Sequence, residues 1–231
     1  MLRFDPEQGK VMLTPILADL CVEGISLHEH FRISHEAGCA VALEKLLGCE
    51  KIYYSSATNY NLSRMLNSKI FGGGVTLDWK YVVNHQDPDD SKRRPNNKEE
   101  WTRSISVSPE KRIFSGGEVI RLLNWPGWPG GVDEKCDFYA EMWRNFINEQ
   151  LIKNNISRLP DFYLMIYRNS FTELSQPDFQ NALDGLEKLC ELNTNKNIAS
   201  VIMFRPMIID EILQYDEETL EQMRKIYESK Q

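Results

Sequence analysis

The sequence predicts an α+β protein in which helices flank a central, mostly antiparallel split sheet and a helical segment comes first. One observation is the alternation of serine with apolar residues over Ser104–Ser108, which is typical of a strand with one polar and one apolar face. Another is the set of helix-start signals before apolar residues at helical spacing, as at Ser34 and Asp133. The third is the polar stretch 84–100, which predicts a long solvated loop because it has no aliphatic side chain to bury.

Composition and charge exclude several classes of protein. The chain has 231 residues, 42% of them hydrophobic, which is enough for one sizeable core or two small ones. Its net charge of −7 argues against general nucleic-acid binding, because phosphates are neutralised by clustered Lys and Arg. Five cysteines without a Cys-x-x-Cys pair indicate free thiols rather than a disulfide framework or a zinc site. The N-terminus lacks the features of a signal peptide and no apolar run could span a membrane, so we expect no membrane contact and a cytoplasmic location, in a bacterial or host cell or in a virion.

The first fifty residues are predicted to be mostly helical. The threonine and proline at 14–15 fit the N-cap and the first position of a short helix that ends at Gly24. Ser34 can cap a second helix that ends at Gly48. We therefore treat 1–50 as a helical N-terminal segment.

The next segment is predicted to contain short strands around one helix. Ile52–Tyr54 is a β-prone run, and apolar residues at helical spacing follow it as far as Ile70. Apolar and polar residues alternate over Val75–Val83, which predicts a further strand. The polar loop 84–100 is either a tolerated surface insertion or a functional lid, since long loops often bind ligands.

The segment from Trp101 to Asn124 is predicted to supply two strands of one sheet. Ile105 and Val107 form the apolar face of the first strand. The glycines after Ser115 permit a turn with positive φ, and the apolar run Glu118–Leu123 is expected to be the second strand.

The sequence WPGWPGG at 125–131 excludes regular structure, while its two tryptophans need somewhere to pack. Trp125 and Trp128 either fill a buried corner or form an exposed docking loop, because tryptophans are common anchors of protein interfaces. The second interpretation predicts a protein partner bound through these two residues.

Helices and strands continue to the C-terminus. The chain divides into an α+β core over 51–155 and a C-terminal α/β part over 156–231 packed on it, unless 1–231 is one domain. The expected elements are a helix from Asp133 to Leu151, a strand over Phe162–Ile166, a helix from Pro177, a strand over Ile198–Phe204, and helices over Met207–Leu213 and Glu217–Tyr227.

Three of the four histidines lie between His28 and His35. In a strand, His28 and His30 would share one face and could bind zinc together with Glu36 or Cys39. The spacing matches no familiar metal motif, so structural or surface histidines are the favoured interpretation and no metal site is predicted. The sequence also lacks the G-x-S-x-G, P-loop and G-x-G-x-x-G motifs, which leaves the enzyme classes that use them unsupported.

Three segments follow one another within 51–124: IYYSSATNYNLSRMLNSKIF, TRSISVSPEKRIF and GEVIRLL. They place a tyrosine-rich strand before a helix, a Ser-x-Ser strand after it, and then a further apolar strand. This order resembles the first half of small ADP-ribosyltransferase-like domains of bacteria and phages. The resemblance implies a split sheet that binds NAD and a possible transfer of ADP-ribose to a macromolecular acceptor.

The resemblance also implies roles for individual residues. A donor on the first strand and a serine on the second would hold NAD, and a late glutamate would stabilise positive charge at the ribose. The residues matched are Tyr54 and Glu141 as catalytic residues, with Glu134 as an alternative glutamate, and Tyr53, Ser104 and Ser106 as cofactor-binding residues.

Tyr54 stands where those domains usually have His or Arg, and a tyrosine carries no positive charge near neutral pH. A second function therefore stays open: a non-enzymatic structural or adaptor protein, such as a phage or viral assembly component, that acts through protein–protein contacts. The plainest alternative is that Ser104 and Ser106 face solvent and that Tyr53 and Tyr54 pack in a sheet.

Overall fold

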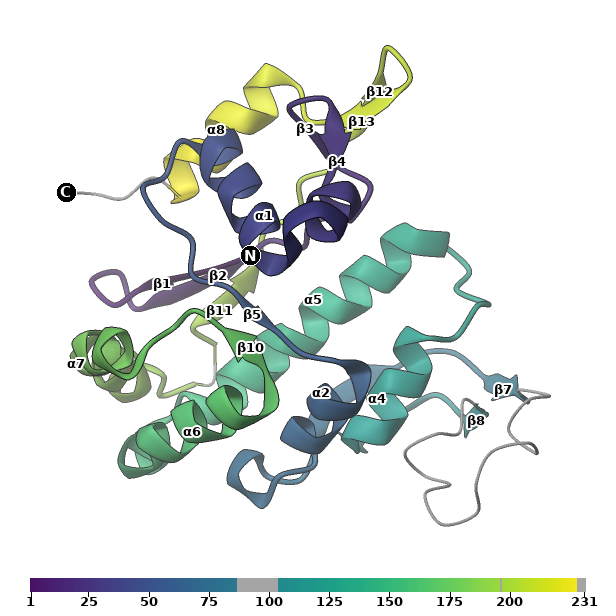
Figure 1. Ribbon diagram of the computed structural model, residues 1–231. Helices are drawn as coiled ribbons and strands as arrows, with labels where there is room; N and C mark the ends of the chain where they lie inside the picture. Colours follow the sequence, from purple (N-terminus) through teal and green to yellow (C-terminus); the bar gives the residue numbers. More distant parts are fainter. Residues whose placement is uncertain (87–103, 196, 228–231) are drawn as a thin grey trace.

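The computed structural model describes residues 1–86, 104–195 and 197–227 of the chain. It confirms the predicted α+β class, with helices around several small sheets that are mostly antiparallel (Figure 1). Most of the predicted polar loop 84–100 lies outside the described residues. The long helix α5 (Gly131–Gln150) runs through the middle of the molecule, and the other elements are arranged around it.

The remaining elements follow in chain order. The strands are β1 (Leu2–Asp5), β2 (Lys10–Leu13), β3 (Cys21–Val22), β4 (Ile25–Ser26), β5 (Ser55–Ser56), β6 (Val75–Trp79), β7 (Val83–His85), β8 (Ile105–Val107), β9 (Glu110–Phe114), β10 (Phe171–Thr172), β11 (Ala199–Val201), β12 (Met207–Ile209) and β13 (Ile212–Gln214). The other α-helices are α1 (Leu27–Leu47), α2 (Asn59–Leu66), α4 (Gly116–Leu123), α6 (Leu159–Asn169), α7 (Gln176–Leu192) and α8 (Glu217–Tyr227).

The largest sheet joins the first two strands of the chain to β11, which comes late in the sequence. β1 and β2 pair antiparallel, and β11 adds to β2 in parallel with Val201 opposite Leu13. β6 pairs antiparallel with β9, so that Val75 lies opposite Phe114. The other strands form two-stranded ladders: β3–β4, β5–β10, β7–β8 and β12–β13.

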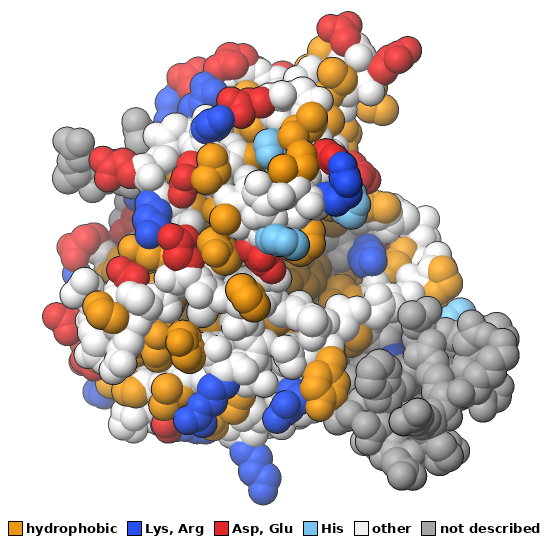
Figure 2. Space-filling model, viewed as in Figure 1, with side chains coloured by type: hydrophobic (Ala, Val, Ile, Leu, Met, Phe, Trp, Pro, Cys, Tyr) orange, Lys and Arg blue, Asp and Glu red, His pale blue; other side chains and the backbone are white. Residues whose placement is uncertain are grey.

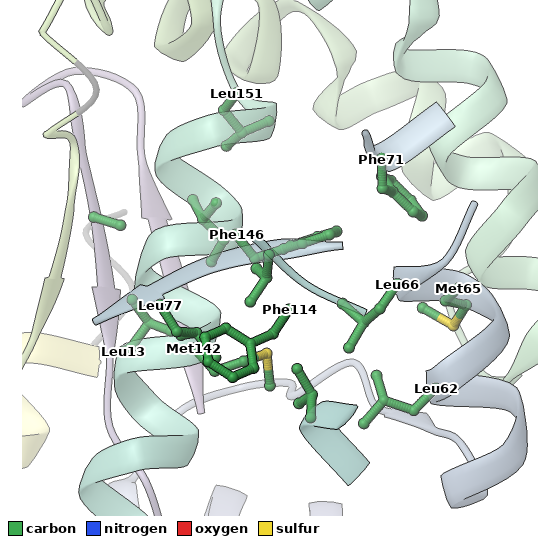
Figure 3. Packing of buried hydrophobic residues seen from close by; sticks show 14 of the residues in the cluster. Leu13, Leu62, Met65, Leu66, Phe71, Leu77, Phe114, Met142, Phe146 and Leu151 are labelled. Carbon is green, nitrogen blue, oxygen red and sulfur yellow. The ribbon is translucent and has the colours of Figure 1, made fainter. Parts of the chain in front are cut away.

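The main core lies where α5 packs against both β6 and β11 (Figure 3). α2 and α4 close it from the side of β9, and they contact each other closely. Phe114 and Leu66 are completely or almost completely buried at its centre, together with Met142 from α5. Burial of this apolar surface, at roughly 25 cal/mol per Å², is the main force that holds elements distant in sequence together.

A second, smaller cluster packs α8 against α1 and β3. Leu47 and Met223 are almost completely buried there, and the hydroxyl of Tyr227 donates to Thr14 Oγ1 at 2.7 Å. The predicted helix over Glu217–Tyr227 is therefore confirmed, with Asp216 accepting a hydrogen bond from the backbone N–H of Thr219 at 2.7 Å.

Helix α1 is broken in the middle. Ser26 caps its start by accepting from the N–H of Glu29, and the chain leaves helical geometry at Ser34 and at His35, whose φ is 53° and ψ −147°. Such a conformation is strained for a residue with a side chain. The break also brings the carbonyl of His30 close to Gly38, where an added Cβ would lie 2.6 Å from that oxygen. The predicted helix start at Ser34 is therefore the second half of a longer, kinked helix.

The predicted strand over Glu118–Leu123 is wrong, because these residues belong to helix α4. Ser115 accepts from the N–H of Glu118, and the Glu118 carboxylate accepts from the N–H of Ser115 at 2.9 Å. This reciprocal capping starts a helix directly after β9. Sequence reasoning took the glycines after Ser115 for a turn between strands and missed the capping pair.

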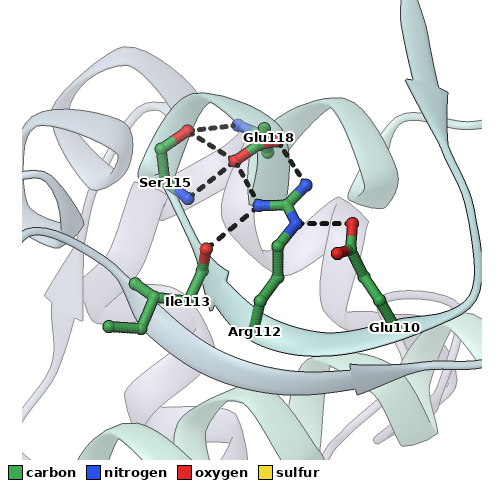
Figure 4. A network of polar contacts seen from close by, with 5 residues as sticks. All are labelled: Glu110, Arg112, Ile113, Ser115 and Glu118. Carbon is green, nitrogen blue, oxygen red and sulfur yellow. Dashed lines mark hydrogen bonds and ion pairs between the residues drawn. The ribbon is translucent and has the colours of Figure 1, made fainter.

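Arg112 fixes this corner from the strand side (Figure 4). Its guanidinium lies 2.7 Å from a carboxylate oxygen of Glu110 and 2.7 Å from one of Glu118. It also lies over the ring of Phe114, 4.0 Å from the ring centre. Strand β9 and helix α4 are thereby held at a fixed angle to each other.

Two predicted helices are β-hairpins instead. The segment expected to form a helix up to Gly24 contains β3 and β4, and Glu23 and Gly24 both have positive φ between them. Asp210 and Glu211 have positive φ between β12 and β13, where Met207–Leu213 was expected to be helical. Positive φ at both central residues is the geometry of the tight hairpin turn, which turns the chain back instead of continuing a helix.

The predicted strands at Ile52–Tyr54 and Phe162–Ile166 are also wrong. The strand there is β5, which begins at Ser55, directly after the predicted one ends, because Ser55 and Ser56 pair with β10. The second segment lies inside α6, in which a proline occupies the first turn. Proline is favoured at that position of a helix, so Pro160 starts α6 and does not end the preceding helix.

Candidate functional site

The residues assigned to NAD lie in three separate parts of the fold (Figure 1). Tyr53 is exposed, and its hydroxyl donates to Asp178 at the start of α7 at 3.1 Å, a bond that raises the pKa of Tyr53. The backbone carbonyl of Tyr54 accepts from Thr172 Oγ1 at 2.9 Å, next to β10. Both tyrosines therefore help to join the chain before β5 to the chain around β10.

The two serines and the glutamates lie elsewhere. Ser106 is an exposed residue of β8, opposite Asn84 of β7, and Ser104 directly precedes that strand. Glu141, on α5, forms an ion pair with Arg144 at 2.9 Å. Glu134 accepts from the hydroxyl of Tyr81, a bond that keeps the pKa of Glu134 below its ordinary value. The catalytic and cofactor roles given to these residues, and NAD itself, stay predictions.

The histidines and tryptophans also have clear positions. His30 lies within hydrogen-bond distance of the carbonyl of Val22, and His35 packs edge-on against Phe31. Within the described residues, no group of His, Cys, Asp and Glu is arranged to hold a metal ion. Trp128 is buried against Trp79, whereas Trp125 is half-buried beside them. The loop of the two tryptophans thus packs largely inward, and the protein partner assigned to it stays a prediction.

A polar hollow of about 300 Å³ lies where α1, α2, α6 and β10 meet. Figure 2 shows the face that carries it, which is hollowed below α1. Three of its side chains are engaged in local structure. Thr58 caps α2 by accepting from the N–H of Asn61, Asn169 donates to the carbonyl of Met165 at 2.8 Å, and Ser170 donates to that of Ile166 at 2.8 Å.

Strand pairing sets the floor of this hollow. Ser56 of β5 lies directly opposite Phe171 of β10, so their side chains share one face of the ladder. Ser55 donates to Ser170 Oγ at 2.8 Å, which ties the two strands together at the side. Phe171 is 75% exposed, although burial of a phenylalanine side chain is favourable.

Four polar side chains of the hollow have no hydrogen-bond or ion-pair partner among the described residues: those of Glu36, Ser56, Asn61 and Arg168. They comprise a carboxylate, a hydroxyl, an amide and a guanidinium, so the hollow offers both donors and acceptors. Glu36 is the residue after the break in α1, and the break therefore sets where its carboxylate lies. Such an arrangement can hold a small polar ligand by hydrogen bonds.

A second hollow, of about 290 Å³, runs along the side of α1. Lys45 and Glu23 lie on it and form an ion pair of 2.8 Å, while Val41 and Ala42 make its lining more apolar. Its charged groups satisfy each other, so it offers a ligand less than the polar hollow does. Within the part of the chain that the structure describes, no helix has the length and apolarity needed to cross a membrane.

Comparison with known proteins gives the fold a precedent. No protein-family model and no curated protein matches the sequence. Solved structures do match over nearly the whole chain. A candidate transcription regulator from Eubacterium siraeum has a TM-score of 0.77 and 16% identity, over 95% of this chain and 80% of its own. TagV from B. subtilis has a TM-score of 0.72 and 13% identity, over 97% and 85%.

A third match, TagT, was solved with a ligand, as "TagT bound to LI-WTA". Its TM-score is 0.64 at 11% identity, and the match covers 97% of this chain and 80% of TagT. Identities this low establish a shared fold only. This chain therefore shares its fold with TagV and TagT.

These matches overturn the resemblance drawn from residues 51–124. The fold is not that of an ADP-ribosyltransferase-like domain, so the predicted transfer of ADP-ribose is wrong. The alternative role in phage or viral assembly has no support. The physical reason is local: the segment GEVIRLL forms helix α4, so the expected order of strands does not exist. Short motifs of tyrosine and serine matched by chance.

Sequence reasoning missed the residues of the polar hollow. Arg168, Phe171 and Ser56 were assigned no functional role, and Glu36 was considered only as a possible zinc ligand. One signal of a polar site was available in the sequence. Phe171 follows three polar residues, and two serines stand at 55–56. Nothing in the sequence indicates that these segments, more than a hundred residues apart, pair in one ladder.

Proposed function

We propose that this chain binds a cell-wall glycopolymer or a lipid-linked precursor of one. The observation that carries the proposal is the match of nearly the whole chain to TagT, whose structure holds LI-WTA, and to TagV. TagT, TagU and TagV are cell-wall teichoic acid phosphotransferases. The match extends over 97% of this chain, so the entire fold corresponds and no isolated motif carries the likeness.

The surface chemistry of this chain is compatible with such a ligand. A glycopolymer presents hydroxyl groups that both donate and accept hydrogen bonds, and the polar hollow has donors and acceptors that pair with no described residue. The net charge of −7 would oppose non-specific attraction of a polyanion, so recognition has to come from local contacts.

Calorimetric titration of the purified chain with isolated wall teichoic acid tests the proposal. We expect saturable binding that survives 0.15 M salt, because local hydrogen bonds and packing are screened less than surface charge. Neutral dextran and inorganic polyphosphate of similar length serve as control polymers. The absence of binding to teichoic acid, or equal binding to polyphosphate, would contradict the proposal.

A further inference from the structure

We propose that the polar hollow is a subsite for one neutral sugar ring, in which Phe171 packs against the ring face and Arg168 and Glu36 hydrogen-bond to its hydroxyls. This inference rests on the proposed function for the identity of the biological ligand, whereas the residues of the hollow indicate the sugar ring. A single sugar ring would be the part of a glycopolymer that this chain recognises.

The size of the hollow selects a small ligand. At about 300 Å³ it stands at the lower end of the range for ligand sites, which runs from roughly 300 to 1,000 Å³. One six-membered ring fits such a volume, whereas several linked rings would extend beyond it. The remainder of a polymer would continue over the surface outside the hollow.

The charges of the hollow favour a neutral ligand over a free phosphate. Arg168 is the cation and Glu36 is the anion among its lining side chains, and neither has an ion-pair partner among the described residues. A phosphate would gain the attraction of Arg168 but would meet the repulsion of Glu36. A sugar hydroxyl can donate to the carboxylate while its neighbour accepts from the guanidinium, so both charged groups are satisfied.

The exposed phenylalanine supplies the apolar part of the site. Phe171 is 75% exposed at the hollow, and its cross-strand neighbour Ser56 carries on the same face a hydroxyl that no described residue binds. The faces of pyranose rings carry C–H groups that pack on aromatic rings, and their edges carry hydroxyls. An aromatic ring beside free hydrogen-bonding groups matches both parts of such a ring.

The backbone around the hollow is fixed by hydrogen bonds that do not involve the groups proposed to bind the ligand. Ser170 and Asn169 are bonded to α6, and the ladder of β5 and β10 fixes the backbone at Ser56 and Phe171. The free groups thus project from anchored backbone on both sides. This preorganisation reduces the loss of conformational entropy on binding.

Saturation-transfer NMR on the full chain, with glucose and N-acetylglucosamine as separate probes, tests the inference, and phosphorus NMR line broadening reports the binding of inorganic phosphate. We expect transfer to at least one sugar, with Phe171→Ala weakening its binding about 2- to 13-fold, as an aromatic contact of roughly 0.5–1.5 kcal/mol implies. Phe171→Trp should retain binding. Phe4→Ala is the matched control, because Phe4 is a 44% exposed phenylalanine on β1.

The outcomes separate this inference from the proposed function. No transfer to either sugar, equal binding by wild type and Phe171→Ala, or binding of phosphate alone would overturn the sugar subsite. If teichoic acid still binds in that case, the proposed function stands without this hollow. If the sugars bind in a Phe171-dependent way but the polymer does not, the subsite stands and the proposed function fails.

Discussion

Arg112 and Arg168 occupy opposite environments in the same fold. Arg112 contacts two glutamates at 2.7 Å and covers a completely buried phenylalanine, Phe114. Arg168 has no such partner among the described residues and lies in a hollow with an exposed phenylalanine, Phe171. The same residue types therefore stabilise the fold at one place and stay available at the other. Arg112 is partly covered and bonded, so it stabilises the fold, whereas Arg168 is exposed and stays accessible to a ligand.

The largest expected difference is between the two phenylalanines. Phe114→Ala should lower the free energy of unfolding by about 3–5 kcal/mol, because it leaves a cavity in the main core under Arg112. Phe171→Ala should change it by no more than about 0.5 kcal/mol, because that ring is already in water. Urea unfolding followed by circular dichroism measures both. Equal losses would show that Phe171 is a structural residue.

The next largest difference in stability is expected between variants of the two arginines. Arg112→Ala leaves the partly buried carboxylate of Glu118 without its ion pair, and we expect a loss of about 1–3 kcal/mol in the same measurement. Arg168→Ala is the matched control and should be neutral within about 0.5 kcal/mol. A double variant, Arg112→Ala with Glu118→Gln, should recover part of the loss. No recovery would mean that packing on Phe114 matters more than the charge pair.

Acid should weaken the contribution of the Arg112–Glu118 pair to stability. Burial raises the pKa of Glu118, but hydrogen bonds from Arg112 and Ser115 outweigh this effect and hold the pKa below its ordinary value. A lowered pKa in the folded state gives stability that is present above the unfolded pKa, about 4.5, and is lost as the pH falls through the folded value.

Stability curves between pH 6 and pH 2.5, roughly two units around the ordinary glutamate pKa, test this point. We expect the wild type to lose more stability than Glu118→Gln over this range, so the two curves converge in acid.

The smallest effect concerns the break in α1 that positions Glu36. His35→Gly should raise the free energy of unfolding by up to about 1 kcal/mol, because relief of backbone strain exceeds the entropy cost of a glycine. Ser34→Gly is the control, since Ser34 has a negative φ of −135° and gains nothing from glycine. Thermal unfolding compares the two. A loss of stability in His35→Gly would mean that contacts of the imidazole outweigh the strain.

Local signals predicted the elements that depend on local chemistry. The helix after residue 131, the helix from Pro177 and the strand near Ile198 are present, because apolar periodicity and capping act over a few residues. The errors arose where one residue type has two uses. Glycine or an acidic residue with positive φ makes a hairpin turn as readily as it ends a helix, and proline starts helices as well as ending them.

By itself, the sequence determined the α+β class and most of the long helices. Only the tertiary structure decided that β5 pairs with β10, that β11 joins β2, and that Glu36 and Arg168 line one hollow. The physical reason is the range of the forces involved. Propensity and capping act between neighbours in the chain, whereas pairing and burial join residues more than a hundred positions apart, which no local pattern records.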